Sequence, residues 1–234
     1  MSANFIRKLV FPPRCPLCDR AVDERFGSVC GWCERDITST IEPVCAICGK
    51  PVDSFDRELC RDCTGHEHTF TQARAAFIYK GAVRESMYRF KYSNRRTLAD
   101  FYASRYFDIN GKWLSHIKPD VIVPIPLHVS RQRRRGYNQA ALFARALGRL
   151  SGIPVREDII FRVKKTIPQK KLSAQLRKSN LSGAFAISDE AGGFERVLLA
   201  DDIYTTGSTI DEAAWLFTRR GISVYAACIC TGDV

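Results

Sequence analysis

The sequence predicts an α/β fold in which a parallel sheet, flanked by helices, is preceded by a small cysteine-rich module. Eight of the ten cysteines lie in the first 63 of 234 residues, and none of the next 164 residues is a cysteine. After them, short runs of branched apolar residues alternate with segments of helical spacing, as in 197–200 followed by 210–220. Strands that alternate with helices are typical of parallel sheets covered on both faces. We therefore expect one module over residues 1–70 and an α/β domain over residues 71–234.

The amino-terminal cysteines form four CxxC pairs, each beginning fifteen residues after the last. They are Cys15 and Cys18, Cys30 and Cys33, Cys45 and Cys48, and Cys60 and Cys63. A CxxC turn places two thiolates on one metal ion, and two such turns complete a tetrahedral site of four thiolates. The pattern therefore predicts two structural Zn²⁺ ions, and we expect chelation to unfold this module while the rest stays folded.

Two features of this module stay open from the sequence. Consecutive pairs give the shortest loops between ligands, but a crossed arrangement of pairs is also possible. His66 and His68 follow the last pair and are either substitute ligands or linker residues; with eight thiols present, we favour linker residues.

Charge and hydropathy indicate a cytoplasmic protein with an anionic partner. The apolar run at 5–13 is interrupted by Arg7 and Lys8 and is too short for a signal peptide or a membrane span. Clustered cysteines in the reducing cytoplasm bind metal more often than they form disulfides. Residues 1–70 carry nine basic and eleven acidic side chains, whereas 131–180 carry fourteen and two. Such a concentration favours a polyphosphate ligand or nucleic acid, the alternative being a solvated basic surface.

Further elements follow from periodicity. Strands are expected at 75–79, 120–127, 159–163, 184–187 and 223–230, and helices over 83–107, with an interruption near 93–96, and up to 152. The segment 83–107 interleaves aromatic and basic side chains, which either form a surface for single-stranded nucleic acid or, in the favoured interpretation, a core face and a basic face. These side chains are Tyr88, Phe90, Lys91, Tyr92, Arg95 and Arg96.

The stretch VLLADDIYTTGST at 197–209 is the strongest candidate for a ligand site. A buried strand runs into Asp201 and Asp202, then into a hydroxyl-rich turn and a helix. Loop amides and the first N–H groups of a helix bind anions. The turn residues that would hold a phosphate are Thr205, Thr206, Gly207, Ser208 and Thr209.

The two aspartates restrict the class of ligand that this site could bind. The turn lacks the lysine of the GxxxxGK[ST] phosphate loop, and carboxylates beside a phosphate would repel it unless they face another group. Asp201 and Asp202 fit if they accept hydrogen bonds from sugar hydroxyls, which predicts a phosphorylated ribose. The alternative is an acidic turn with Ser208 as the helix N-cap.

Two further segments fit a polyphosphate ligand. The strand DVIVPIPL is stopped by Pro124 and Pro126, and arginines follow it. Arginines after a strand end suit pyrophosphate, whose charges need neutralising. Residues 164–185 are polar and basic, as in a mobile flap that closes over an anion with Lys170, Lys171 and Arg177; the alternative is a disordered surface loop.

The motifs resemble those of known families. The stretch 197–209 resembles the phosphoribosyl-pyrophosphate (PRPP) loop of type I phosphoribosyltransferases. Together with VPIPLHVSRQRRRGYNQA and KKTIPQKKLSAQLRKSNLSGAF, it resembles the ComF/GntX family of competence-associated phosphoribosyltransferase-like proteins, which carry an amino-terminal double zinc ribbon. The resemblance spans essentially the whole chain, and Tyr137 stands where phenylalanine is usual.

The resemblance implies a type I phosphoribosyltransferase-like sheet that binds PRPP with Mg²⁺. The 5′-phosphate would lie in 205–209, and Asp201 and Asp202 would hold the ribose and favour the positive charge that develops at C1. Pyrophosphate would be bound by Pro126, Leu127, Arg131 and Arg135.

Two functions follow from this resemblance. One is a phosphoribosyltransferase that transfers ribose 5-phosphate with release of pyrophosphate and is associated with DNA uptake. The alternative is a non-catalytic competence factor that keeps the fold and binds single-stranded DNA, with other competence proteins as partners. The acceptor, turnover and oligomeric state are left open.

Overall fold

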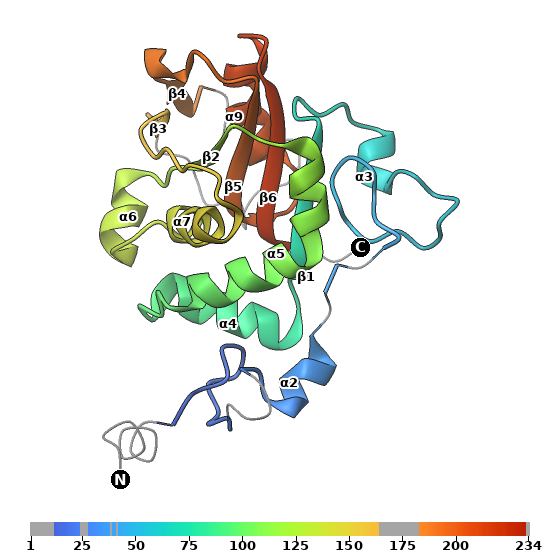
Figure 1. Cartoon of the computed structure of the whole chain (residues 1–234), viewed down its shortest axis with the longest axis vertical. Coiled ribbons are helices and arrows are strands. Elements are labelled where there is room, and N and C mark those ends of the chain that lie inside the picture. Colours follow the sequence, from blue (N-terminus) through green and yellow to red (C-terminus); the bar gives the residue numbers. More distant parts are fainter. Residues whose placement is uncertain (1–11, 24–27, 38, 41, 164–182, 233–234) are drawn as a thin grey trace.

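The computed structural model describes residues 12–23, 28–37, 39–40, 42–163 and 183–232. Its centre is a sheet of four parallel strands in the order β1, β6, β5, β2 (Figure 1). The strands are β1 (Gln72–Ile78), β2 (Val121–Pro124), β5 (Arg196–Tyr204) and β6 (Ser223–Thr231). Since all four run the same way, their carboxyl ends meet at one edge of the sheet. The predicted fold class, a parallel sheet flanked by helices after a cysteine-rich segment, is confirmed.

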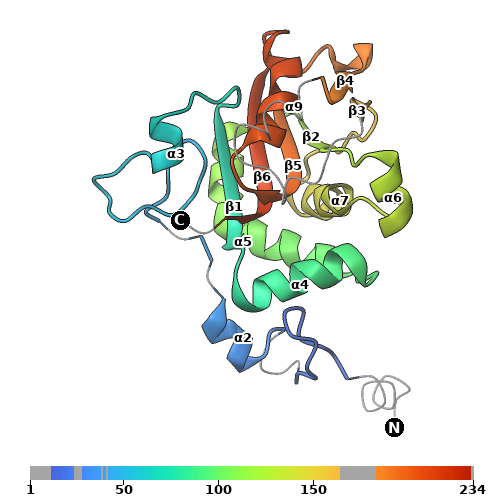
Figure 2. The same cartoon turned by 180° about the vertical axis from the view of Figure 1, so that it is seen from behind.

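Helices cover both faces of the sheet (Figures 1 and 2). One face carries α4 (Gly81–Tyr92), α5 (Leu98–Ile117) and α7 (Gln139–Ser151); the other carries α9 (Ser208–Thr218). Within β5, Val197 and Leu199 join the hydrophobic cluster under α9, while Leu198 and Ala200 join the cluster on the opposite face. The apolar run at 197–200 is therefore buried on both sides, as a central parallel strand requires.

Helix ends agree with the sequence signals. The interruption expected near 93–96 is a turn between α4 and α5, in which Asn94 has φ +53°. Helix α7 ends at Gly152, which takes the left-handed conformation with φ +75° that glycine adopts without strain. The short α6 (Val129–Arg135) follows the end of β2.

A second, smaller sheet lies beside the first. Strands β3 (Ile160–Arg162) and β4 (Phe185–Ile187) pair antiparallel, and the 3-10 helix η3 (Asp189–Ala191) follows. Both strands lie where the sequence predicts them. Most of the predicted flap, with Lys170, Lys171 and Arg177, lies outside the described residues.

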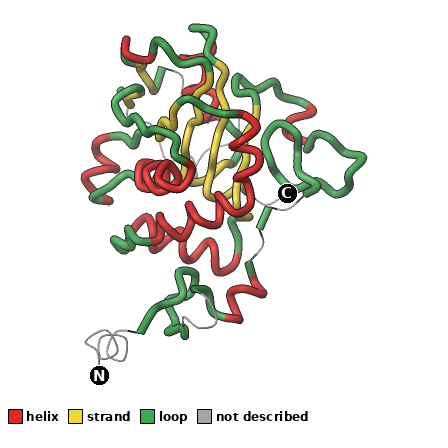
Figure 3. Tube along the Cα trace, viewed as in Figure 1, coloured by secondary structure: helices red, strands yellow, loops and turns green. Residues whose placement is uncertain are grey.

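The cysteine-rich segment is mostly loop, with the short helices α2 (Gly31–Asp36) and α3 (Arg61–Thr64) (Figure 3). We call the described residues 12–37 the first ribbon and 42–64 the second ribbon. The first ribbon rests on α4, where the Ser86 hydroxyl donates a 2.6 Å hydrogen bond to the Pro16 carbonyl. The second ribbon covers the edge strand β1, where the Ala73 N–H donates to the Ile47 carbonyl at 2.6 Å. A domain boundary near residue 70 stays a prediction.

Candidate metal centres and phosphate site

The eight amino-terminal thiols gather into two groups of four. Cys15, Cys18, Cys30 and Cys33 form one, and Cys45, Cys48, Cys60 and Cys63 form the other. Consecutive CxxC pairs therefore share a site, which settles the choice that the sequence left open. Cys18 and Cys30 lie 3.6 Å apart between their sulfurs, and Cys48 and Cys60 lie 3.5 Å apart. Two thiolates on one tetrahedral Zn²⁺, with Zn–S bonds of about 2.3 Å, are separated by about 3.8 Å, so both groups fit zinc.

The two four-cysteine groups differ in accessibility. All four cysteine side chains of the second ribbon are buried, and they join the hydrophobic cluster under α9 together with Phe70 and Tyr204. In the first ribbon Cys18 and Cys30 are only partly buried. A chelator therefore reaches the first group more easily.

The turn after β5 has the geometry of an anion site. The strand runs through Tyr204, residues 205–207 form the turn, and α9 begins at Ser208. The first intrahelical bond is donated by the Asp211 N–H to the Gly207 carbonyl at 2.8 Å. The N–H groups before it belong to the helix start, which attracts anions through its backbone dipoles.

Gly207, rather than Ser208, occupies the N-cap position of α9. Its φ is +79°, and no side chain caps the helix. The alternative of a Ser208 N-cap is therefore wrong; the Ser208 hydroxyl instead lies 2.8 Å from the Thr206 hydroxyl. A Cβ at Gly207 would lie 2.6 Å from the Tyr204 hydroxyl and 2.9 Å from Cε1 of His68, so the turn closes tightly on the side chains beneath it.

Asp201 and Asp202 both belong to β5 and point to opposite faces, because successive strand residues alternate. Asp202 forms an ion pair with Lys91 of α4 at 2.8 Å, and both side chains are more than four-fifths buried. Burial, and next the charge of Asp202, raise the pKa of Asp201 to about 7. Asp201 therefore changes its charge near neutral pH.

Three basic side chains interact electrostatically with these acids. Lys91 and Arg162 act on Asp201 in the direction that lowers its pKa, and Arg131 is subject to the field of Asp202. Burial and the neighbouring Arg131 lower the pKa of Arg162 to about 10. Burial, followed by Arg135, also lowers the pKa of Arg131. A cluster of cations that disfavour one another near two acids is suited to a ligand of negative charge.

The predicted pyrophosphate residues have different surroundings. The Ile125 N–H donates to the Ala200 carbonyl at 2.8 Å, so the loop after β2, with the half-buried Pro126 and Leu127, starts beside β5. Arg135 instead donates to the Gln139 side chain at 2.8 Å and lies 5.1 Å from the centre of the Tyr92 ring. Asp202 acts electrostatically on Arg131, which places this arginine within reach of the acids.

The aromatic and basic side chains of α4 and of the turn that follows it have separate partners. Phe90 is fully buried, in agreement with the favoured core face, and Arg95 forms an ion pair with Asp19 of the first ribbon. Tyr88 and Tyr92 remain 61% and 47% exposed, with ring centres 4.9 Å apart. Two exposed rings therefore lie near the arginines of α6.

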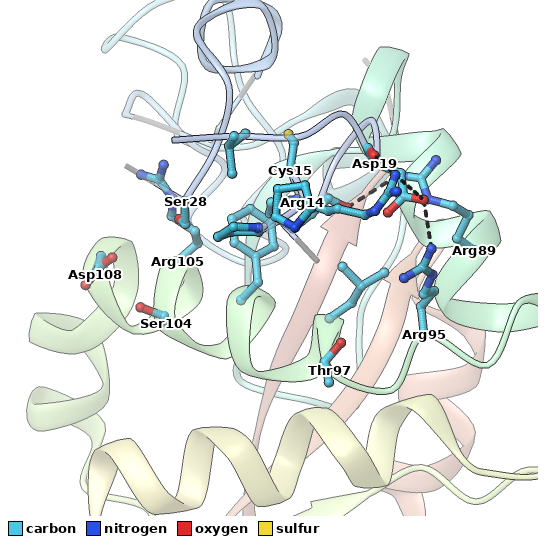
Figure 4. A pocket seen from close by; sticks show the side chains of 16 residues that line it. Arg14, Cys15, Asp19, Ser28, Arg89, Arg95, Thr97, Ser104, Arg105 and Asp108 are labelled. Carbon is cyan, nitrogen blue, oxygen red and sulfur yellow. Dashed lines mark hydrogen bonds and ion pairs between the residues drawn. The ribbon is translucent and has the colours of Figure 1, made fainter. Parts of the chain in front are cut away.

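A cavity of about 750 Å³ separates the first ribbon from α4 and α5 (Figure 4). Arg89 and Arg95 line it, but Arg89 donates to the Leu17 carbonyl and Arg95 is paired with Asp19. Of the residues assigned to ligand or metal, this cavity contains Cys15 alone. Its polar groups thus connect the ribbon to the helices.

Several side chains beside the candidate site could not be assigned to it from the sequence. The sequence predicts Lys91 only as part of a nucleic-acid surface or a basic helix face, and both Lys91 and Arg162 lie in segments far from 201–202, so only the folded chain brings them near the acids. His68, interpreted as a linker residue, has a side chain 1% exposed that lies 2.9 Å from Asp211 of α9. The pattern HxH near the last CxxC pair was visible, but its partner is 143 residues away.

Comparisons with known proteins agree with this architecture. Residues 6–64 match the double zinc ribbon domain family. The chain is 42% identical to competence protein F of Haemophilus influenzae over 142 residues, or 57% of this chain and 61% of that protein. It is 42% identical to the DNA utilization protein YhgH of Salmonella typhi over 48% of this chain and 49% of that protein, and 30% identical to competence protein ComFC of Bacillus subtilis over 64% and 59%.

The molecule is an α/β protein built on a parallel sheet with an amino-terminal double zinc ribbon. Together with the double zinc ribbon, these relatives support an assignment to the ComF family. It spans about half to three fifths of the length of the relatives it matches. Across the part of the chain that the structure describes, no helix combines the length and apolar character needed to cross a bilayer.

Proposed function

We propose that this protein binds PRPP with Mg²⁺ and transfers its ribose 5-phosphate group to an acceptor with release of pyrophosphate. The observation that carries the proposal is the meeting, at one sheet edge, of two acids and a helix-start turn rich in hydroxyls. Asp201 and Asp202 lie near the carboxyl end of the central strand, which ends at Tyr204, and the turn at 205–207 and the start of α9 follow. PRPP offers the matching groups: ribose hydroxyls for carboxylates and a terminal phosphate for N–H groups.

Each residue has a role in this proposal. Thr205, Thr206, Gly207, Ser208 and Thr209 hold the 5′-phosphate. Asp201 and Asp202 accept hydrogen bonds from the ribose hydroxyls, and Arg131 and Arg135, with the backbone of Pro126 and Leu127, hold the pyrophosphate. Mg²⁺, bound together with PRPP, would neutralise part of the charge of the leaving pyrophosphate.

Charge also favours the transition state. As pyrophosphate departs, positive charge develops at C1 of the ribose, and two carboxylates beside it stabilise that charge. Asp201, with a pKa of about 7, has to be ionised for this role, and the approach of Mg²⁺ with its ligand favours the ionised form. Catalysis then rests on positioning and electrostatics, without a covalent intermediate on the protein.

The names of the relatives indicate a setting. Competence and DNA utilization proteins are among them, so we propose that the reaction serves DNA uptake in natural transformation. The described cysteines are all free thiols, and zinc-binding thiolates persist in a reducing compartment, which favours the cytoplasm.

The site is tested by calorimetry with PRPP and Mg²⁺ on Asp201→Asn and Asp202→Asn. We expect both variants to lose Mg²⁺-dependent binding, because asparagine removes the negative charge while keeping the shape. Asp189→Asn is the matched control, since that aspartate lies on η3 with its side chain exposed. Unchanged PRPP affinity in the first two variants would contradict the site. Turnover is tested by pyrophosphate release with nucleobases and DNA as acceptors.

A second candidate function is supported by the exposed pair Tyr88 and Tyr92, near Arg135. Proteins that bind single-stranded DNA stack its bases on exposed aromatic rings and contact its phosphates with nearby arginines, as this arrangement would allow. With this function the protein would be a non-catalytic competence factor. Binding of an oligonucleotide should weaken steeply as salt rises, and Tyr88→Ala with Tyr92→Ala should weaken it at low salt. Phe55→Ala, at another exposed ring, is the control. Absence of binding at low salt removes this function.

A further inference from the structure

We propose that His66, His68 and Asp211 form a third metal site that takes a divalent transition-metal ion of the Zn²⁺ type. Their donor atoms are two imidazole nitrogens and one carboxylate oxygen, and all three lie within 4.8 Å of one another. Two histidines with one carboxylate are the ligands of open zinc sites, in which a water or small ligand completes the coordination. None of these side chains belongs to either four-cysteine group.

The separations suit one ion between the donors. Oδ2 of Asp211 lies 2.9 Å from Nδ1 of His68 and 3.5 Å from Nε2 of His66. With Zn–N and Zn–O bonds of about 2.0–2.1 Å, two ligands of a tetrahedral ion are about 3.3 Å apart, between these two values. His66 has a side chain 40% exposed, so it has room to adjust.

A second set of hydrogen bonds orients the ligands. The Thr69 N–H donates to Oδ1 of Asp211 at 2.8 Å, which leaves Oδ2 facing the imidazoles. The remaining ring nitrogen of His68, Nε2, lies 3.4 Å from the Tyr204 hydroxyl. Metal-binding histidines and carboxylates are held by outer partners of this kind, which fix the tautomer and the direction of the ligand atoms.

A cavity beside the three metal-binding side chains leaves one coordination position of the ion open to solvent. A cavity of about 470 Å³ is lined by His66 and Asp211, and by Glu67, Ser208 and Glu212. Water can therefore reach the ion and complete its coordination. Ser208 also begins α9, so the cavity adjoins the phosphate turn.

The site would connect two distant parts of the chain. His66 and His68 belong to the segment after the second ribbon, and Asp211 lies in the first turn of α9. His68 packs directly below Gly207, as the 2.9 Å approach to a Cβ at that position indicates. An ion here would fix the ribbon segment against the base of the phosphate turn.

The proposal is tested by counting bound zinc. The full chain is dialysed against a buffer that holds free Zn²⁺ in the micromolar range, and metal is measured by mass spectrometry. We expect three equivalents in the wild type and two in His66→Ala, which keeps the hydrogen bonds of His68 and Asp211. Asp211→Asn should also hold two. His116→Ala, an exposed histidine in α5, is the matched control and should hold three.

Cobalt gives a second readout. Sites built from four cysteines show thiolate-to-cobalt charge transfer, whereas the third equivalent of Co²⁺ should add only weak d–d bands, absent in His66→Ala. Two zinc equivalents in the wild type would overturn the proposal. So would a third equivalent that His66→Ala and Asp211→Asn both retain, because the ion would then lie elsewhere.

Discussion

At the scale of single residues, the carboxylate of Asp201 has the most unusual environment. It lies near the carboxyl end of β5, directly after a run of residues buried on both faces of the sheet, and Asp202 is the next residue. Removing a carboxylate from water disfavours its charged form, and a second carboxylate beside it adds to the effect. The pKa of about 7 follows from these two causes despite the opposing Lys91 and Arg162.

This environment predicts a pH dependence of stability. Because the pKa of Asp201 is raised from 3.8 to about 7, the folded state keeps a proton that the unfolded state has lost between these values. Stability from this group is therefore greatest at low pH and falls as pH rises to about 7. Asp201→Asn removes the penalty, so its free energy of unfolding relative to the wild type should rise by up to about 3 kcal/mol between pH 5 and pH 8.

Urea unfolding of both proteins across that range measures the difference. Asp189→Asn should show a flat difference, since that side chain is exposed. A flat difference for Asp201→Asn as well would contradict the raised pKa.

Gly207 allows a separate prediction about the phosphate turn. Gly207→Ala forces a residue with a Cβ into φ +79° and brings that Cβ against the Tyr204 hydroxyl and His68. Gly152→Ala meets the same backbone cost at φ +75° but has nothing within 4 Å. We expect about 1 kcal/mol of lost stability for Gly152→Ala and a larger loss for Gly207→Ala, with weaker PRPP binding only in the latter. Equal losses and equal binding would show that the turn tolerates the side chain.

At the scale of elements, the sequence predicts strands and helices well because each has a local cause. The run 197–200 lacks polar residues and becomes a central strand, and Gly152 ends α7. The side chains around the acids could not be predicted in this way, because Lys91 and Arg162 meet them only after α4 and β3 pack at the same edge. The Ser208 cap was wrong because Gly207, with positive φ, already starts the helix.

The second ribbon should support the phosphate turn more than the first does. Its four cysteines share a cluster with Tyr204, whose hydroxyl lies beside the Gly207 turn, whereas the first ribbon packs on α4. We expect Cys60→Ser to weaken PRPP binding at least tenfold and Cys30→Ser, the same change in the first ribbon, to alter it less than twofold. Binding is measured by calorimetry with zinc content recorded. Equal effects of the two variants would exclude this coupling.

At the scale of the whole molecule, the two ribbons are continuous with the core. Leu17 and Val29 of the first ribbon join the cluster on the α4, α5 and α7 face, and the cysteines of the second ribbon join the cluster under α9. A boundary at residue 70 was predicted from composition, since cysteines stop and apolar runs begin there. Composition carries no information on packing between the parts, and these shared clusters make the stability of one depend on the other.

Chelation tests this dependence. Cys18 and Cys30 are partly buried, while the second group is buried, so the two ribbon ions should leave in separate phases, with the first ribbon losing its ion faster. The sequence alone led us to expect that the α/β part would be unaffected. From the shared clusters we expect instead that loss of the second ion lowers the thermal midpoint of the α/β part by several degrees, because apolar side chains such as Phe70 and Tyr204 become exposed. A zinc-sensitive dye follows the release of zinc during chelation, and circular dichroism measures the thermal midpoint. An unchanged midpoint after complete zinc loss would establish two independent units.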